Sequence, residues 1–167
     1  MKKGVLMKKI ALGNNQIASI CSWGYIERKE QMKTIEVVAA IIKKEDKIFI
    51  TRRSYGDFAD MWEFPGGKIE AGESKEEALV REIREELELD INNLDYLTTV
   101  DYDYPTFHLT MHCFTCEICG GELVLNAHND AKWVSLSELQ SQKWVPADVE
   151  VVEKLMNRME WRVNSYI

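Results

Sequence analysis

The sequence predicts a single globular domain of the α/β or α+β class, with a mixed sheet lying between helices. The chain has 167 residues, a length that suits one domain with a full core. Short β-favouring runs fill much of the chain after residue 33, and helical patterns lie between and after them. Because strands and helices do not alternate regularly, the order favours a sandwich over a βαβ array.

A β-hairpin is predicted to open this domain. Ile35–Ile42 is a continuous β-favouring run, which is typical of a strand buried on both faces. Residues 43–47 form a polar turn, Ile48–Thr51 is the second strand, and residues 54–60 form a loop. The next predicted strand is Trp62–Phe64, which ends at Pro65-Gly66-Gly67. Further strands are predicted at Tyr96–Tyr104, Thr106–Ile118, Glu122–Leu125 and Trp133–Val134. Gly120-Gly121 is predicted to join Thr106–Ile118 to Glu122–Leu125.

Helices are predicted at three places. Ser74 and Glu77 form a capping box, in which each side chain bonds the backbone N–H of the other residue. The buried stripe of this first helix consists of Leu79, Ile83 and Leu87, which recur every four residues. A short helix begins at the capping pair Ser135 and Glu138, and a terminal helix covers Asp148–Arg162 with Val151, Leu155 and Met159 on one face.

Composition excludes several classes of protein. The chain has 21 Lys and Arg against 28 Asp and Glu, a net charge of −7, which argues against a protein that coats nucleic acid. No apolar run approaches the roughly 20 residues that span a bilayer. We therefore expect no stable nucleic-acid binding, no membrane insertion and a cytoplasmic location. The first 33 residues carry a net charge of +5, so we interpret 1–33 as a peripheral extension or a misassigned start, and 34–167 as the main domain.

Three cysteines form a C-x-x-C-x-x-C run at Cys113, Cys116 and Cys119 that superficially resembles a metal motif. The surrounding residues predict a strand, and a spacing of three on a strand puts Cys113 and Cys116 on opposite faces. A fourth ligand is also missing. We therefore interpret these residues as reduced, packed thiols of an intracellular protein.

Acidic side chains crowd the first helix. Between positions 67 and 91 there are nine acidic and four basic residues, a net charge of −5. Glu82, Glu85 and Glu86 stand at i, i+3 and i+4, so they fall within one arc about 100° wide. Three carboxylates on one arc suit Mg²⁺, which favours carboxylates plus substrate phosphates.

Two interpretations of this arc are open from the residues alone. Arg81 and Arg84 could offset the repulsion, so a solvated helix with internal ion pairs is the simpler one. The preceding loop favours a metal site, because Gly66-Gly67 lets backbone approach a ligand closely. Glu73 lies on the same loop, at the positive end of the helix dipole.

The spacing of these residues resembles the Nudix box of the Nudix hydrolases. Gly67 is followed after five residues by Glu73, and after seven more by Arg81–Leu89, which reads REIREELEL. This signature is long and fixed in spacing, which makes it far more specific than a lone glycine motif. The resemblance covers roughly Thr34 to Leu155 and is closest to the MutT-like branch. Its flanking segments are Ile35–Ile42, Phe49–Arg53, Trp62–Lys68 and Pro146–Asp148.

The resemblance implies an α/β/α sandwich that hydrolyses a nucleoside diphosphate linked to a further group. It also implies Mg²⁺ or Mn²⁺ held by Glu82, Glu85 and Glu86, with the Gly66 carbonyl as a further ligand. Arg81 matches the position that orients the box glutamates, notably Glu73, and Glu82 is the usual candidate to activate water. The expected catalytic residues are thus Glu82, Glu85, Arg81 and Glu73.

This sequence departs from the family pattern at two places. Glu88 stands where the box has a Gly suited to a left-handed helix cap, so either Glu88 adopts that conformation at a cost of about 1 kcal/mol or the helix runs on. Ala127 stands where the family often has a Glu just before a His. Asn129 and Asp130 are the nearby alternatives to that Glu, although neither is at the matching position. We expect His108, His112 and His128 to be strand or loop residues rather than ligands.

Three further positions match substrate-binding residues of MutT-like proteins. Arg53 matches a base- or sugar-contacting Arg, Tyr104 an aromatic facing the base, and Asp148 a residue that reads the base edge. Each residue also has a simpler interpretation. Arg53 is then a surface Arg at a strand end, Tyr104 a residue packed in the sheet, and Asp148 the N-cap of the last helix. An ionised Asp148 would only accept hydrogen bonds. Phe107 replaces a frequent Arg, which leaves the base preference open.

The resemblance therefore implies a Mg²⁺-dependent nucleoside triphosphate pyrophosphohydrolase that releases a nucleoside monophosphate and pyrophosphate. Removal of oxidised nucleotides such as 8-oxo-dGTP is the first expectation, and a pyrimidine (CTP-type) nucleotide is the alternative. A nucleotide-sensing domain without catalysis is the alternative of another class. The expected partner is the nucleotide substrate, and the chain is a monomer or a homodimer.

Overall fold

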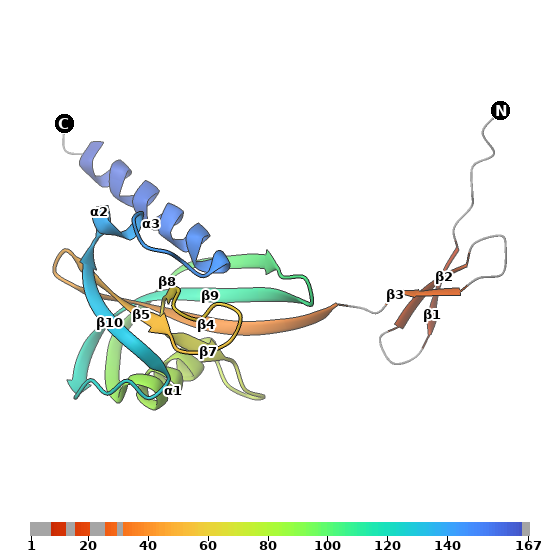
Figure 1. Cartoon of the computed structure of the whole chain (residues 1–167), viewed down its shortest axis with the longest axis horizontal. Coiled ribbons are helices and arrows are strands. Elements are labelled where there is room, and N and C mark those ends of the chain that lie inside the picture. Colours follow the sequence, from red (N-terminus) through yellow and green to blue (C-terminus); the bar gives the residue numbers. More distant parts are fainter. Residues whose placement is uncertain (1–7, 13–15, 21–25, 30–31, 165–167) are drawn as a thin grey trace.

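A computed structural model describes residues 8–12, 16–20, 26–29 and 32–164, with side chains described over 32–158 (Figure 1). Near the N-terminus, the strands β1 (Lys8–Leu12), β2 (Gln16–Ile20) and β3 (Ile26–Lys29) form a three-stranded antiparallel sheet of their own. The interpretation of 1–33 as an extension stays a prediction. No helix in the described ranges is both long enough and apolar enough to cross a membrane.

The main sheet is mixed, as predicted. Its central path runs in the order β10 (His128–Ser135), β5 (Lys47–Arg53), β4 (Lys33–Lys44), β9 (Phe107–Gly121) and β8 (Leu89–Asp103). The pair β4 and β9 is parallel, in register from Lys33 with Phe107 to Ile42 with Cys116. The other described pairs of this sheet are antiparallel.

The predicted hairpin is present, but its strands separate soon after the turn. β4 and β5 pair only at Lys43 with Ile48 and at Lys44 with Lys47. Beyond this point β5 pairs with the short strand β6 (Trp62–Glu63), and β4 pairs with β7 (Gly66–Lys68). The sheet is thus split into two arms that share the hairpin, and the segment 62–68 crosses from one arm to the other.

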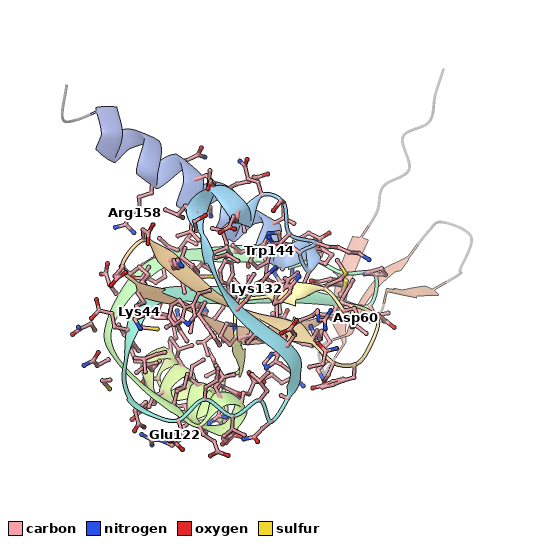
Figure 2. All side chains as sticks on the ribbon, turned by 60° about the vertical axis from the view of Figure 1, so that its left-hand side comes forward. Lys44, Asp60, Glu122, Lys132, Trp144 and Arg158 are labelled. Atoms are coloured by element: carbon pink, nitrogen blue, oxygen red, sulfur yellow. The ribbon has the colours of Figure 1, made fainter. Side chains whose placement is uncertain are left out.

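Helices cover both faces of the sheet, which confirms the α/β/α sandwich. α1 (Lys75–Leu87) lies on one face, while α2 (Leu136–Leu139) and α3 (Pro146–Asn164) lie on the other (Figure 1). Side chains fill the space between these layers (Figure 2). Under α1 the core contains the predicted stripe Leu79, Ile83 and Leu87.

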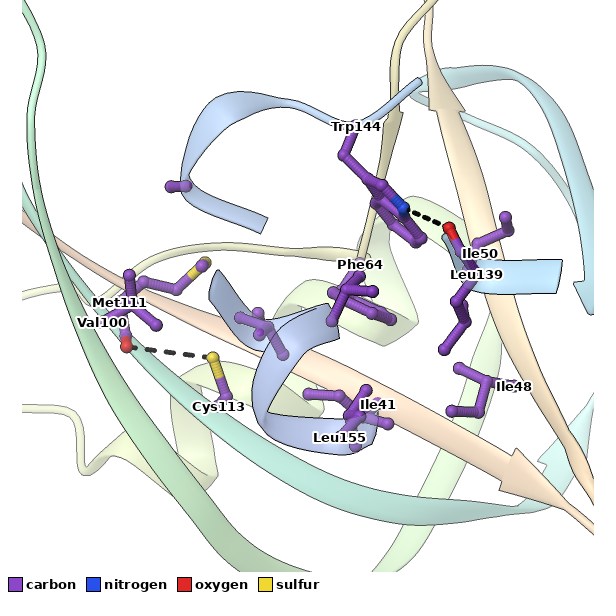
Figure 3. Packing of buried hydrophobic residues seen from close by; sticks show 14 of the residues in the cluster. Ile41, Ile48, Ile50, Phe64, Val100, Met111, Cys113, Leu139, Trp144 and Leu155 are labelled. Carbon is purple, nitrogen blue, oxygen red and sulfur yellow. Dashed lines mark hydrogen bonds between the residues drawn. The ribbon is translucent and has the colours of Figure 1, made fainter. Parts of the chain in front are cut away.

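The second core lies under α2 and α3 (Figure 3). It contains Val151 and Leu155 of the predicted α3 stripe, whereas the side chain of Met159 is outside the described part. Cys113 packs in this core and Cys116 in the one under α1, so the two thiols lie on opposite faces as predicted.

α1 begins and ends through identifiable contacts. The Ser74 side chain accepts from the Glu77 N–H, and the Glu77 carboxylate accepts from the Ser74 N–H, so the capping box is formed. At the other end, Glu88 adopts the left-handed conformation with φ of 56° and its N–H bonds the Arg84 carbonyl. Of the two possibilities for Glu88, the structure therefore has the left-handed cap.

The prediction of a strand at Glu122–Leu125 is wrong. β9 extends through Gly121, so Gly120-Gly121 makes no hairpin turn, and residues 122–126 run along the end of α1 instead. The N–H groups of Val124 and Asn126 bond the carbonyls of Leu87 and Glu86, at 3.0 and 2.9 Å. The Asn126 side-chain amide bonds the Glu85 carbonyl at 2.9 Å. This segment therefore satisfies carbonyls that the last turn of a helix leaves unpaired.

Most strands extend beyond their predicted ends, and the difference is largest for β8 and β10. β8 begins at Leu89 rather than Tyr96, because bulges between Asp90 and Thr98 break the alternation that a sequence pattern needs. β10 covers His128–Ser135 rather than two residues.

Candidate active site

A cavity of about 460 Å³ opens where the two arms of the sheet separate. Gly66, Gly67 and Glu86 line one end, from β7 and α1. The other end is lined by aromatic and apolar side chains together with Arg53 and Asp148, and Glu63 and His128 lie between the two ends. The aromatic and apolar residues are Ile35, Val37, Tyr55, Phe58, Phe64, Tyr104, Phe107, Leu109 and Met111. The cavity thus joins an acidic end to an aromatic end, within a single site.

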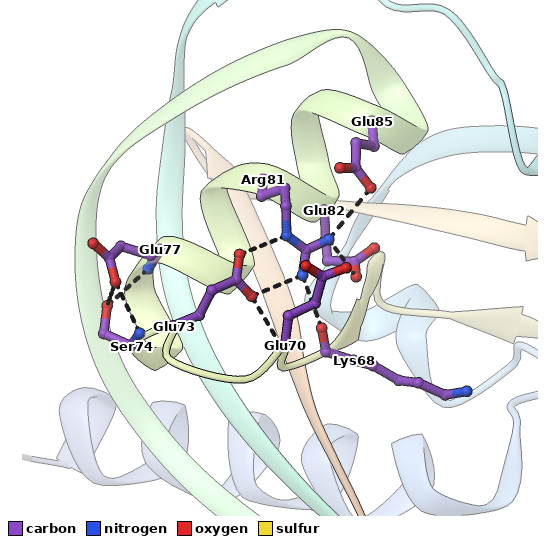
Figure 4. Close-up of polar contacts among 8 residues, drawn as sticks. All are labelled: Lys68, Glu70, Glu73, Ser74, Glu77, Arg81, Glu82 and Glu85. Carbon is purple, nitrogen blue, oxygen red and sulfur yellow. Dashed lines mark hydrogen bonds and ion pairs between the residues drawn. The ribbon is translucent and has the colours of Figure 1, made fainter.

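Arg81 organises the acidic end (Figure 4). Its Nε and Nη2 donate to both Glu73 oxygens at 2.6 and 2.9 Å, and Nη2 also donates to the Lys68 carbonyl at 2.9 Å. Its Nη1 donates to Glu82 at 2.9 Å and to Glu85 at 3.3 Å. Arg81 therefore fixes the loop before α1 to the carboxylates on α1.

The Glu73 carboxylate is held in its ionised form. Hydrogen bonds from the Arg81 side chain, and then from the Glu70 N–H, lower the pKa of Glu73 from 4.5 to about 2. The Glu73 hydrogen bond in turn raises the pKa of Arg81. Glu73 thus serves to hold Arg81, and it does not line the cavity.

The two glycines of the loop have different reasons to be glycine. A Cβ on Gly66 would lie 2.0 Å from the Val38 carbonyl oxygen, because β7 packs directly on β4. A Cβ on Gly67 would lie 2.4 Å from the Glu82 carboxyl carbon. Gly66 is therefore required because any side chain there would collide with the backbone of β4. Gly67 instead leaves space for the Glu82 carboxylate.

Glu86 is the one of the three candidate glutamates that lines the cavity. Burial raises the pKa of Glu86 to about 7; His128 opposes this rise, and Glu82 and Glu63 add to it. Its Oε2 atom is buried and has no hydrogen-bond partner within the described residues. A buried acceptor without a donor is costly, and a cation would satisfy it.

The acidic end fits a hard divalent cation by its chemistry. It offers the Glu82 and Glu86 carboxylates beside the Gly66-Gly67 backbone, which is the oxygen donor set that Mg²⁺ prefers. Glu85 lies further out, with a side chain 60% exposed and bonded to Arg81. Among the described residues, no three His, Cys, Asp or Glu side chains lie together so that they could hold a metal ion, and of the three candidate glutamates only Glu86 lines the cavity. Arg81 holds Glu82 and Glu85, which leaves Glu86 as the carboxylate that Arg81 does not bind.

Asp148 lies at the aromatic end, but not as the helix N-cap. α3 begins at Pro146, so Asp148 falls within its first turn, and its Oδ1 accepts from the Phe64 N–H at 2.9 Å. Burial raises the pKa of Asp148 to about 8, against the effect of this hydrogen bond. This shift in pKa favours the neutral carboxyl at neutral pH, which can donate a hydrogen bond as well as accept one.

Tyr104 belongs to an aromatic cluster. Its ring stacks on Phe107 at 4.8 Å between centroids and lies 5.4 Å from Phe58. The Tyr104 hydroxyl accepts from the Ala147 N–H at 3.4 Å. Arg53 also lines the cavity, where its Nη1 donates to Glu63 at 3.1 Å. All three predicted substrate-binding residues therefore line the same cavity.

Sequence reasoning missed Glu63 and His128. The His128 Nε2 lies 3.2 Å from a Glu63 oxygen and 4.0 Å from Glu86 Oε2, so His128 is a site residue and not only a strand residue. The sequence offered one signal for Glu63, because it is a charged residue between two aromatic residues in a short, half-buried strand. His128 gave no such signal, because its neighbours Glu63 and Glu86 are far from it in the sequence.

The residues near Ala127 do not replace the missing Glu. Asn129 bonds Arg52 and Asp60, and Asp130 pairs with Arg52 at 3.5 Å. Neither lines the cavity, whereas Ala127 does. Both alternatives to a Glu at Ala127 are therefore wrong.

Comparisons with known proteins agree with this geometry. The NUDIX domain family matches residues 32–155. The chain is 36% identical over 126 residues to the CTP pyrophosphohydrolase of Escherichia coli, covering 75% of this chain and 93% of that protein. It is also 36% identical to the 8-oxo-dGTP diphosphatase of Escherichia coli, covering 74% of this chain and 98% of that protein.

Solved structures show the same fold. The solution structure of the E. coli ORF135 protein aligns with a TM-score of 0.68 at 36% identity, covering 75% of this chain and 91% of the other. The MutT protein of methicillin-resistant Staphylococcus aureus aligns with a TM-score of 0.60 at 34% identity, covering 77% and 99%.

Proposed function

The chain belongs to the NUDIX domain family, and on that premise we propose that it is a divalent-cation-dependent nucleotide pyrophosphohydrolase of the MutT type. It hydrolyses a nucleoside triphosphate to the monophosphate and pyrophosphate. The observation that carries this proposal is the single cavity that joins the acidic end, with Glu86 and the Gly66-Gly67 backbone, to the aromatic end with Tyr104 and Asp148. A triphosphate with its cation needs the first end, and a base needs the second.

Glu82, Glu85 and Glu86, together with the Gly66 carbonyl, would hold the cation, which is Mg²⁺ or Mn²⁺. When bound, it neutralises the phosphate chain and lowers the pKa of bound water. Arg81 orients the carboxylates, with Glu73 holding Arg81 in turn. For Glu85 to bind the cation, its carboxylate must exchange its bond with Arg81, and its exposure leaves it free to rotate.

Glu82 is the proposed group that activates water. Its carboxylate lies against Gly67 and is bonded to Arg81 Nη1, with a side chain only 14% exposed. This placement keeps one carboxylate beside the loop while Glu86 remains available to the cation.

The aromatic end is proposed to bind the base. Arg53, Tyr104 and Asp148 supply a cation, a ring face and a carboxyl that can both donate and accept. Oxidised deoxynucleotides such as 8-oxo-dGTP are the first proposed substrates, and CTP or dCTP the second. Relatives named for each activity are equally similar to this chain. The neutral Asp148 fits both bases, because each offers an acceptor next to an N–H.

The test is pyrophosphate release from a panel of nucleoside triphosphates that includes 8-oxo-dGTP and CTP, with and without Mg²⁺. We expect Glu85→Gln and Glu86→Gln to abolish most activity. Glu76→Gln is the matched control, because Glu76 is an exposed residue in the first turn of the same helix. Nucleotide binding without any pyrophosphate release would favour the sensor alternative. Equal turnover of all nucleotides would refute both specific substrates.

A further inference from the structure

One buried imidazole lies between the two ends of the cavity. His128, the first residue of β10, has a side chain only 4% exposed. Its Nε2 is 3.2 Å from Glu63 Oε1 and 4.0 Å from Glu86 Oε2. The other Glu63 oxygen accepts from Arg53 Nη1 at 3.1 Å. Arg53, Glu63, His128 and Glu86 thus form one continuous polar chain from the aromatic end to the acidic end.

The hydrogen bond to Glu63 determines what His128 can do. A carboxylate only accepts, so the His128 Nε2 carries the hydrogen and donates it. The Nδ1 atom is also buried, and it has no partner among the described residues. Native proteins rarely leave such an atom unpaired, and those that occur call for an explanation. A structural role would be served at lower cost by an apolar residue.

The surroundings of Glu86 indicate what the Nε2 side of the ring does. Its nearest charged neighbours include Glu82 and Glu63, which repel its carboxylate, whereas His128 attracts it. The His128 Nε2 lies 4.0 Å from Glu86 Oε2, beyond hydrogen-bond length, and this oxygen has no hydrogen-bond partner within the described residues. The imidazole therefore offsets part of the repulsion between Glu86 and its two acidic neighbours.

We propose that His128 is a positioning residue, which holds the Glu86 carboxylate at the cation end of the cavity and is itself held by Glu63. This inference rests on the proposed function, because Glu86 is there a cation ligand. Groups that orient a ligand in this way change metal affinity or activity by about 10- to 100-fold when they are removed. Through Glu63 the same imidazole links cation binding to Arg53, and so to the base.

The experiment titrates nucleotide-free protein with Mn²⁺ and measures free Mn²⁺ by electron paramagnetic resonance. We expect His128→Ala to raise the dissociation constant for Mn²⁺ by about 10-fold or more. His128→Gln is expected to restore most of the affinity, because its amide N–H can donate to Glu63. At saturating Mn²⁺, the KM for nucleotide is expected to change less than the metal requirement does.

His112→Gln is the matched control. His112 is equally buried, but its nitrogens lie 2.8 Å from Glu36 and 2.9 Å from Thr99, and it does not line the cavity. We expect this variant to bind Mn²⁺ like the wild type. Wild-type affinity in His128→Ala, or an equal loss in His112→Gln, would overturn the proposal.

A second variant decides the matter if His128→Ala does not fold. Glu63→Gln keeps the shape of the side chain but removes the charge that holds the ring, so we expect weaker Mn²⁺ binding. Unchanged binding in Glu63→Gln would overturn the proposal. These outcomes are separate from the proposed function, since the wild type can release pyrophosphate whether or not His128 positions Glu86.

Discussion

Replacing Gly67 with Ala tests whether the loop exists to seat a carboxylate. The new Cβ would lie 2.4 Å from both the carboxyl carbon and Oε2 of Glu82. Non-bonded carbons settle near 3.5 Å, so the Glu82 carboxylate must move by about 1 Å. A displacement of about 1 Å at a reacting centre can lower the rate by about 10²-fold. We therefore expect kcat/KM to fall by about two orders of magnitude.

The same substitution should cost little stability. The Glu82 carboxylate is the end of a flexible side chain and can rotate away, losing its 2.9 Å bond to Arg81. A partly exposed ion pair of this kind contributes about 1 kcal/mol or less. Gly66→Ala is the contrast, because its Cβ would lie 2.0 Å from the Val38 carbonyl oxygen and only backbone movement relieves this. We expect Gly66→Ala to lower the unfolding free energy by about 3 kcal/mol.

Two assays separate the expected effects. Steady-state pyrophosphate release measures the loss at Gly67, and urea unfolding followed by tryptophan fluorescence measures the loss at Gly66. Wild-type kcat/KM in Gly67→Ala would refute the assigned place of Glu82 in catalysis. A large loss of stability in Gly67→Ala would show instead that this glycine serves the fold.

Three other outcomes are expected. Arg81→Lys should raise the pKa of Glu73 from about 2 toward its usual value, because a lysine cannot supply both hydrogen bonds; carboxyl-detected NMR titration measures this. The folded chain keeps the Asp148 proton up to about pH 8, whereas the unfolded chain releases it near 3.8. The unfolding free energy should therefore fall as pH rises between these values, and Asp148→Asn should flatten the fall in urea titrations at several pH values. Glu88→Gly should raise the unfolding free energy by about 0.5–1 kcal/mol in the same urea assay, because φ of 56° suits glycine.

The sequence was informative where local chemistry and packing agree. The capping box at Ser74 and the stripe ending at Leu87 are both local signals, and α1 follows them closely. The opposite placement of Cys113 and Cys116 followed from strand alternation alone. Arg53, Tyr104 and Asp148 come from distant parts of the chain; the family resemblance predicted all three, and the fold brings them to one cavity.

Other features depend on tertiary contacts that no local pattern records. Residues 122–125 have the composition of a strand, but their N–H groups find partners at the end of α1. The raised pKa of Asp148 comes from its burial on α3 against Phe64, which depends on the packed fold. Glu63 and His128 become neighbours only after β5 pairs with both β6 and β10.

The segment Glu122–Asn126 makes the protein sensitive to insertions and deletions at this place in the chain. It fastens the carbonyls of Glu85, Glu86 and Leu87, and two residues later the chain reaches His128. An inserted or deleted residue in this segment would shift His128, and with it one wall of the cavity, relative to α1. The exposed turn at residues 45–46 only joins β4 to β5. We therefore expect this turn to accept a peptide tag or an extra loop.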